Sequence, residues 1–267
     1  GLDLSNIDSP ALKFNINPTD ASTSCSNSNP LACMGQSWSK PAIGWVKWGK
    51  TKRLVMFVGG GYDAGGDDGN AKTGTTKGTY AGYEGDAYNQ GTNGRGAGVY
   101  MFDATTGELL WWSSSKATTS SSTTNNGVIG LNDANMKYSV VSEIKTVDRD
   151  ADGLIDHLYF GDLGGQVWRI DLNNSAPALS AFAKTPVRLL NLNKGAYSPR
   201  FYEMPAFTIY RASGQTFAVI SIGSGNRSRP LFESNVPTNG DTTTYQTSAY
   251  NNDAVYNIFD KDVARST

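Results

Sequence analysis

Short apolar and aromatic segments, separated by turn-forming residues, run along most of the 267-residue chain. Glycine, asparagine, serine and threonine interrupt the chain before any apolar pattern reaches the about 12 residues expected of an amphipathic helix. The segments are rich in β-branched and aromatic residues, which favour strands. We therefore predict an all-β fold with strands over residues 54–58, 99–102, 109–112, 138–144, 157–160, 167–172, 187–190, 206–210, 216–222 and 255–259.

A loose repeat connects these strands. In each unit an apolar strand ends in small residues, a turn follows, and a second strand ends in aspartate. The strand nearest the hub of a β-propeller blade is apolar on both faces, and the next strand returns through a glycine-containing turn, so the pattern is typical of such blades. The units are FVGGGY at 57–62 with GVYMFDATTGELLW at 98–111, YFGDLGG at 159–165 with QVWRIDL at 166–172, and ISIGSGN at 220–226 with VYNIFDKD at 255–262.

Three such units are too few to close a propeller, which needs about four to eight blades. We therefore predict that residues 1–267 form a single domain, a modified β-propeller with a partial set of blades, and that it is part of a larger propeller domain. Long polar stretches at 63–98, 116–130 and 232–253 are predicted to be surface loop insertions and not linkers between domains.

The composition narrows the classes of function. The chain has 23 Lys and Arg against 24 Asp and Glu, without a basic run, so neither nucleic acid nor an anionic membrane is a predicted partner. No apolar run approaches the about 20 residues of a membrane span. The 30 Gly and 13 Tyr are typical of an extracellular all-β protein. Trp111, Trp112 and Trp168 lie at strand positions and are predicted to fill the blade core.

The two cysteines, Cys25 and Cys33, lie in a segment rich in serine and asparagine. One pair that closes a short polar loop predicts a disulfide formed in an oxidising compartment, and two free thiols are the alternative. Two cysteines and the single histidine, His157, cannot supply the closed tetrahedral shell of a structural zinc site.

The segment DRDADGLID at 148–156 carries the strongest chemical signal in the sequence. Its spacing, D-x-D-x-D-G-x-x-D, lets several oxygen ligands converge on one hard cation, and the glycine permits the sharp turn. Tyr159 stands where an EF-hand has glutamate, and strands are predicted on both sides, so we predict a calcium loop on a β-scaffold. The predicted ligands are the carboxylates of Asp148, Asp150, Asp152 and Asp156 and the backbone carbonyl of Leu154.

Other interpretations of the acidic and glycine-rich segments have less support. The 148–156 loop could be a plain acidic turn, but its carboxylates repel one another unless a cation neutralises them. A catalytic carboxylate pair lacks a neighbouring nucleophile or base, and a general-base role for His157 has no support. No helix is predicted after GGGYDAGG at 59–66, so we predict no phosphate cradle there. A second acidic cluster matches no metal-binding spacing and is predicted to be solvated; it consists of Asp63, Asp67 and Asp68.

Residues 147–172, VDRDADGLIDHLYFGDLGGQVWRIDL, closely resemble the calcium-loop and blade segment of the PilY/PilC family of type IV pilus tip proteins. The resemblance covers most of the chain from residue 35 onward, apart from the long insertions. Four further segments are similar to that family in the same order: GQSWSKPAIG at 35–44, FVGGGYDAG at 57–65, GVYMFDATTGELLW at 98–111 and ISIGSGNRSRPL at 220–231.

This resemblance implies the C-terminal, modified β-propeller domain of a large exported bacterial protein, without its N-terminal adhesive region. It implies a location at the pilus tip or the outer-membrane surface, and roles in pilus biogenesis, twitching motility and attachment to host-cell or abiotic surfaces. The implied partners are pilins and minor pilins, and calcium is implied to modulate pilus extension against retraction. The chain contains Gly94-Arg95-Gly96 but no Arg-Gly-Asp, so integrin binding is not predicted.

Two alternatives from other classes stay open. GVYMFDATTGELLW also matches the blade repeat of quinoprotein dehydrogenases, which use pyrroloquinoline quinone with calcium. Those enzymes hold calcium with scattered residues, and Cys25 and Cys33 are not the vicinal pair often found beside the quinone. An integrin-like interaction propeller would have the same calcium loop but different partners. We predict a protein that is not an enzyme and that takes calcium as its cofactor.

Overall fold

The computed structural model describes residues 1–17, 25–63, 95–121, 127–194, 198–227 and 253–263. In this part of the chain the regular elements are β-strands and two short 3-10 helices, without an α-helix, so the prediction of an all-β fold is confirmed. The 3-10 helices are η1 (Pro30–Cys33) and η3 (Leu179–Ala181). Among the described residues no helix is long and apolar enough to span a membrane.

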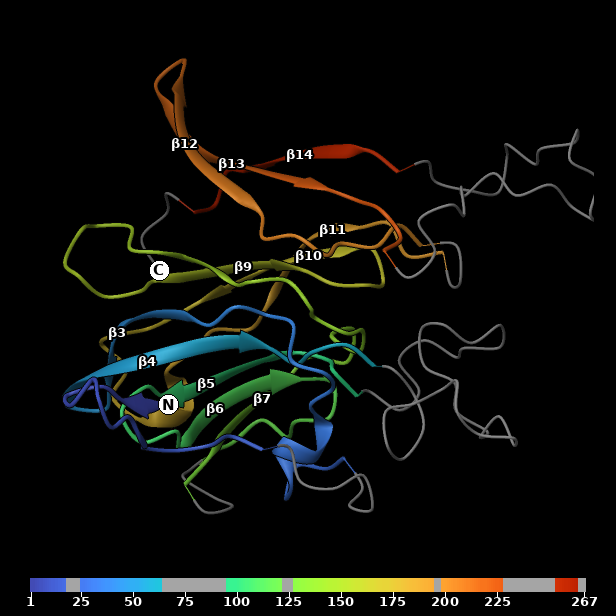
Figure 1. Cartoon of the computed structure of the whole chain (residues 1–267). Coiled ribbons are helices and arrows are strands. Elements are labelled where there is room, and N and C mark those ends of the chain that lie inside the picture. Colours follow the sequence, from blue (N-terminus) through green and yellow to red (C-terminus); the bar gives the residue numbers. More distant parts are fainter. Residues whose placement is uncertain (18–24, 64–94, 122–126, 195–197, 228–252, 264–267) are drawn as a thin grey trace, which may run out of the picture.

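Three sheets make up most of the molecule and lie one above another (Figure 1). All neighbouring strands in them are antiparallel except β6 and β7, which are parallel. The first sheet has the order β3 (Ala42–Trp48), β4 (Thr51–Gly59), β5 (Val99–Asp103), β6 (Leu109–Ser114) and β7 (Ile129–Asn132). The second has the order β11 (Val187–Asn191), β10 (Gln166–Asp171), β9 (His157–Gly161) and β8 (Lys145–Val147).

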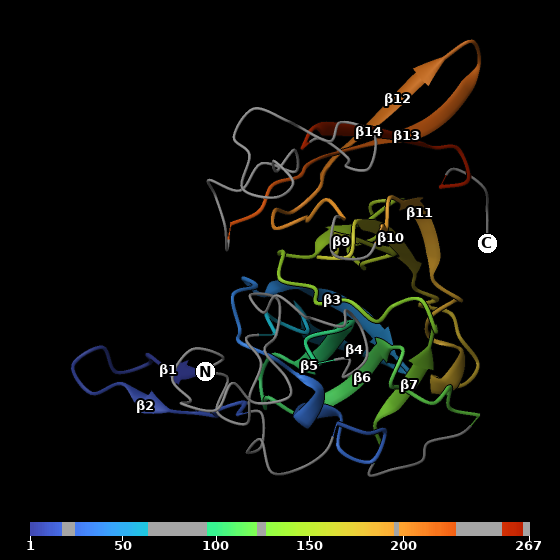
Figure 2. The same ribbon diagram turned by 90° about the vertical axis from the view of Figure 1, so that its right-hand side faces the viewer.

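The third sheet has the order β12 (Ala206–Ala212), β13 (Gln215–Gly223) and β14 (Val255–Asp260). A small hairpin of β1 (Leu2–Asp3) and β2 (Ala11–Leu12) lies beside the first sheet near the N-terminus (Figure 2). The sheets contain the pairs that the repeat predicts, namely β4 with β5, β9 with β10, and β13 with β14. The described residues form several open sheets and no closed barrel, so the propeller stays a prediction.

Every predicted strand except 138–144 lies within or overlaps an observed strand. The prediction for 138–144 is wrong. This segment is largely buried, but its backbone bonds several different segments: Val140 N–H donates to Gly96 O, Gly61 N–H donates to Val140 O, and Leu163 N–H donates to Ser139 O. Its apolar residues reflect a buried connection and not a ladder with one partner strand.

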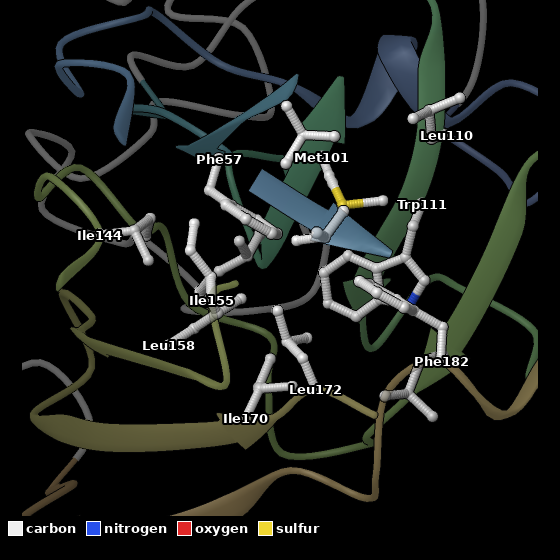
Figure 3. Packing of buried hydrophobic residues seen from close by; sticks show 14 of the residues in the cluster. Phe57, Met101, Leu110, Trp111, Ile144, Ile155, Leu158, Ile170, Leu172 and Phe182 are labelled. Atoms are coloured by element: carbon white, nitrogen blue, oxygen red, sulfur yellow. The ribbon is translucent and has the colours of Figure 1, made fainter. Parts of the chain in front are cut away.

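The largest hydrophobic cluster fills the space between the first and second sheets (Figure 3). Alternate residues of β9 and β10 point into it, as the two-residue period of a strand requires. Trp111 and Trp168 belong to this cluster, whereas Trp112 packs on the other face of the first sheet. All three tryptophans are buried, as predicted. A further cluster, which includes Tyr159 and Ile220, joins the second sheet to the third.

The loop predictions have a mixed outcome. Asp63 is predicted to be solvated, but it is only 1 % exposed, because the chain that leaves β4 stays inside the fold before it reaches the long insertion. Asp67 and Asp68 lie outside the described residues, as do 64–94, 122–126 and 228–252, which include most of the first and third predicted loops and the centre of the second.

Candidate metal centre

The acidic loop 148–156 connects β8 to β9 at one end of the second sheet. Val147 and His157 are paired across these two antiparallel strands, and Asp156 N–H donates to Val147 O at 2.8 Å. The two ends of the loop are therefore held next to each other. This hairpin confines the acidic residues to a small volume, as the sequence predicts for a loop entered from one strand and left by another.

Two residues of the loop have a left-handed backbone. Gly153 has φ of 82° and Ala151 has φ of 62°. Glycine adopts this conformation freely, whereas alanine does so uncommonly. Carboxylates hold the turns, since Asp148 Oδ2 accepts Gly153 N–H at 2.9 Å and Asp150 Oδ1 accepts Asp152 N–H at 3.3 Å. The local backbone is thus shaped by the same side chains that are predicted to bind the cation.

Asp148, Asp150 and Asp156 each contribute one carboxylate oxygen to a group in which all these atoms lie within 4.8 Å of one another. The first two residues are exposed and Asp156 is half-buried. Negative charges at such separations repel, and a cation between them removes the repulsion. A set made only of oxygen donors suits a hard cation, and a flexible all-protein cage favours calcium over magnesium. The residues present therefore fit a calcium ion.

Asp152 lies outside this group of three. Its Oδ1 accepts Leu154 N–H at 2.7 Å, which stabilises the second half of the loop. A ligand role for the second carboxylate oxygen of Asp152, and for the backbone carbonyl of Leu154, stays a prediction.

Asn174, which was not predicted from the sequence, contacts the last two residues of the acidic loop. Its Nδ2 donates to Ile155 O at 3.0 Å and to Asp156 Oδ1 at 3.4 Å. Its Oδ1 accepts Lys47 N–H of β3 at 2.9 Å. One amide side chain thus joins a predicted metal ligand to a strand of the neighbouring sheet. Little in the sequence marks Asn174 as a site residue, because an asparagine after a strand is usually a turn residue.

Lys52 brings a positive charge to the loop. Its Nζ lies 3.6 Å from the point that a Cβ on Gly153 would occupy. The same ammonium lies 5.4 Å from the centroid of the Trp45 ring, a cation–π contact that holds it at this position. Lys52 therefore partly offsets the negative charge of the loop.

His157 follows the last predicted ligand but points into the interface between the second and third sheets. It is buried, and its Nδ1 lies 2.7 Å from Asp171 Oδ1. Arg169 Nε lies 2.9 Å from the same oxygen, and Arg169 Nη1 donates to both carboxylate oxygens of Asp260. Asp260 Oδ2 also accepts the Tyr159 hydroxyl. Burial opposes ionisation of Asp171, but the hydrogen bond with His157 and the charge of Arg169 hold its pKa below the ordinary value. This network joins two sheets and is separate from the metal loop.

Asp162 anchors the tight turn between β9 and β10. Its Oδ1 accepts the N–H groups of Gly164 and Gln166, at 2.9 and 3.0 Å. Its Oδ2 accepts Gln166 Nε2 and Trp168 Nε1, both at 2.9 Å. Complete burial raises the pKa of Asp162 to about 6, against the effect of these four donors. The G-D-L-G-G motif is therefore a structural turn built around one buried carboxyl group.

Cys25 and Cys33 are joined by a disulfide next to η1. Cys33 is buried in the cluster that covers the outer face of the first sheet. The disulfide thus closes a short loop at this face.

Comparisons with known proteins agree with the motifs. No family model matches the chain. The chain is 28 % identical over 159 residues to a type IV pilus biogenesis factor PilY1 homologue of Xylella fastidiosa, an alignment that covers 53 % of this chain and 10 % of that protein. It also matches the crystal structure of the Pseudomonas aeruginosa PilY1 C-terminal domain, with a TM-score of 0.53 and 14 % identity over 97 % of this chain and 42 % of the solved chain.

The chain therefore spans a tenth of the length of the curated relative and less than half of the solved structure. At 14 % identity the structural match is evidence for the fold, and the sequence relationship rests on the Xylella protein. The chain is thus related in sequence to a PilY1 homologue and shares the fold of part of a PilY1 C-terminal domain, which confirms the predicted resemblance to this family.

Proposed function

We propose that this chain is a calcium-binding β-domain of a type IV pilus-associated protein. The observation that carries the proposal is the group of three carboxylates, within 4.8 Å of one another, on the β8–β9 hairpin of a chain related to a PilY1 homologue. That relative is a pilus biogenesis factor, which supports a role in pilus biogenesis here.

The proposed ligands are the carboxylates of Asp148, Asp150, Asp152 and Asp156 and the carbonyl of Leu154. Bound calcium would supply the positive charge that cancels the repulsion among them. The carboxylates of Asp148 and Asp150 already accept backbone amides of the loop, so they are oriented before a cation arrives. Because the loop joins two paired strands, its occupancy would raise the stability of the second sheet.

The location, the cellular role and the partners that we propose rest on the family resemblance. We place the domain outside the cell, at the pilus tip or the outer-membrane surface, and the Cys25–Cys33 disulfide supports an oxidising compartment. Support of pilus extension and retraction, twitching motility and surface attachment, with pilins and minor pilins as partners, forms the rest of this role. We propose no catalytic activity, because the role proposed for the carboxylates of the acidic loop is to hold a cation.

We also propose that residues 1–267 are one part of a larger β-domain. The outer face of the third sheet carries the ring pairs Tyr210–Phe217 and Phe217–Phe259, with centroids 5.6 and 5.8 Å apart. Phe259 and Val255 on this face are 61 % and 72 % exposed. The other sheets bury such faces against a neighbour, and the solved relative is more than twice as long as the matched part, which supports a further layer here.

Calorimetric titration with calcium tests the metal assignment. The wild-type chain should bind one calcium per loop and melt at a higher temperature with calcium than with chelator. Asp150→Asn keeps the shape but removes one charged ligand, and should weaken calcium binding by about tenfold. Asp8→Asn removes a carboxylate elsewhere that is also exposed, and should bind like the wild type. Absence of both binding heat and melting shift in the wild type would refute the calcium site.

The pilus assignment needs a separate readout. Introduced into the parent protein, Asp150→Asn should reduce the number of surface pili and the twitching zone, while Asp8→Asn should not. Normal piliation and twitching with Asp150→Asn, in a protein shown to have lost calcium, would refute the proposed role of calcium in pilus function.

A further inference from the structure

β3 is an outer strand of the first sheet, with β4 on one side only. In an antiparallel pair, alternate residues direct both N–H and C=O away from the partner strand. Trp45 and Lys47 are such residues, because Trp45 O accepts Ile155 N–H at 2.8 Å and Lys47 N–H donates to Asn174 Oδ1 at 2.9 Å. Both groups that satisfy this edge come from segments next to the second sheet, the acidic loop before β9 and the segment after β10. The unpaired N–H and C=O groups of an edge strand can pair with another chain. The hydrogen bonds from Ile155 and Asn174 therefore protect the edge of β3 from such pairing.

The side chain of Ile155 fixes the loop between the two sheets. Ile155 is 6 % exposed and belongs to the main hydrophobic cluster, where Figure 3 shows it between Phe57 and Leu158. A Cβ added to Gly44 of β3 would lie 2.5 Å from Ile155 Cδ1, so the glycine lets the end of the Ile155 side chain lie close to the backbone of β3. The last turn of the acidic loop is therefore part of the contact between the sheets.

Asn174 connects this contact to the proposed metal site. Its single amide group touches the carboxylate of Asp156, the carbonyl of Ile155 and the amide of Lys47. Groups that hydrogen-bond a metal ligand orient it and tune its affinity for the metal. Asn174 is therefore placed so that a fixed position of the Asp156 carboxylate also fixes the edge strand β3 of the first sheet.

We propose that Asn174 is a positioning residue of the calcium loop, and that the calcium-loaded loop acts as a clasp that holds β3 against the second sheet. This inference rests on the proposed calcium binding. Calcium fixes the carboxylate of Asp156 and the turn that ends at Ile155, and these in turn fix Asn174 and the amide of Lys47. By thermodynamic linkage, the contacts with β3 raise the affinity of the loop for calcium to the same extent.

The test is made on the full chain with Asn174→Ala and a matched control, Asn173→Ala. The control removes an adjacent half-buried asparagine whose Oδ1 accepts Ser175 N–H and so stabilises only the local turn. Calorimetry measures the calcium affinity of each protein. Residue-resolved hydrogen exchange, with calcium and with chelator, measures the protection of the Lys47 and Ile155 amides.

In the wild type, calcium should slow the exchange of both amides. Asn174→Ala should lower the calcium affinity by about tenfold and abolish the calcium-dependent protection of Lys47, while Asn173→Ala keeps both. If Asn174 is only a structural residue, the variant melts at a lower temperature by the same amount with and without calcium and its affinity is unchanged, which overturns the proposal.

The wild-type exchange experiment needs no variant and decides the clasp by itself. Calcium binding without any change in the exchange of Lys47 and Ile155 overturns the clasp but leaves the calcium site intact. The absence of calorimetric heat overturns both the clasp and the calcium site, so the two failures are distinguishable.

Discussion

Replacement of Asp260 by alanine should destabilise the domain strongly, because this residue holds the third sheet to the second through a buried ion pair. The side chains of Asp260 and Arg169 are only 2 % and 7 % exposed, and Arg169 Nη1 lies 2.5 and 2.6 Å from the two carboxylate oxygens. The Tyr159 hydroxyl also donates to Asp260 at 3.1 Å. Alanine would leave a buried guanidinium and a buried hydroxyl without these acceptors.

The expected loss follows from these contacts. Removal of one partner from a buried ion pair costs about 3–5 kcal/mol of unfolding free energy. Arg169 keeps Asp171 as a second partner, 2.9 Å from its Nε, so the lower part of this range applies to the pair. The lost hydrogen bond of Tyr159 adds about 1 kcal/mol. The total is about 4 kcal/mol, which for a chain of this size lowers the melting temperature by about 8–16 °C.

Urea denaturation of the wild type and the variant, at fixed calcium concentration, measures the loss directly. Asp262→Ala removes an exposed carboxylate two residues later and should change the unfolding free energy by less than about 0.5 kcal/mol. If Asp260→Ala costs no more than Asp262→Ala, the assignment of this pair as the connection between the sheets is wrong.

Three further predictions address other parts of the molecule. The intact mass without reductant should lack the two hydrogens of free thiols, and loss of the Cys25–Cys33 disulfide should lower the unfolding free energy by about 2–3 kcal/mol. In calorimetry, Lys52→Met should raise calcium affinity a few-fold, because its ammonium repels the cation, and Lys50→Met in the adjacent turn should raise it less. Asp162 has its pKa raised from 3.8 to about 6 in the folded state, so its contribution to stability is full below pH 3.8 and is lost as the pH rises through about 6. This step, about 3 kcal/mol in the unfolding free energy, should be missing in Asp162→Asn. A fully reduced mass, equal affinities of the two lysine variants, or parallel pH profiles would contradict these predictions in turn.

The strands that the sequence predicts well are those buried on both faces. Every residue of β9 and β5 is buried, and apart from His157 and Asp103 at the ends their sequences are apolar runs that contain glycine as the only small residue. β3 was missed because it alternates between buried and exposed residues and contains Gly44 and Lys47. β8 was missed because it has only three residues. The segment 138–144 misled the prediction because burial, and not pairing with one strand, selects its apolar residues.

The candidate site likewise has one part that can be predicted from the sequence and one part that cannot. The spacing of the acidic motif is local information, and Asp148, Asp150 and Asp156, which it singled out, lie close together in the structure. The role of Asn174 depends on how two sheets meet, and the adjacent Asn173 has the same side chain in the same turn without contacting the loop in this way. Sequence spacing alone cannot distinguish two such residues, because the difference lies in a contact with β3.

The position of β9 explains why one cation could affect a domain of this size. Asp156 precedes β9, whose residues Leu158 and Phe160 pack toward the first sheet, while His157 and Tyr159 face the third. The strand that begins at the acidic loop is therefore shared by both sheet interfaces. A cation that only stabilises this strand raises the melting temperature of the whole domain in one transition, with a concentration dependence set by mass action. A switch requires in addition two arrangements that differ in calcium affinity. The exchange of the β3 edge, compared with and without calcium, separates these two roles.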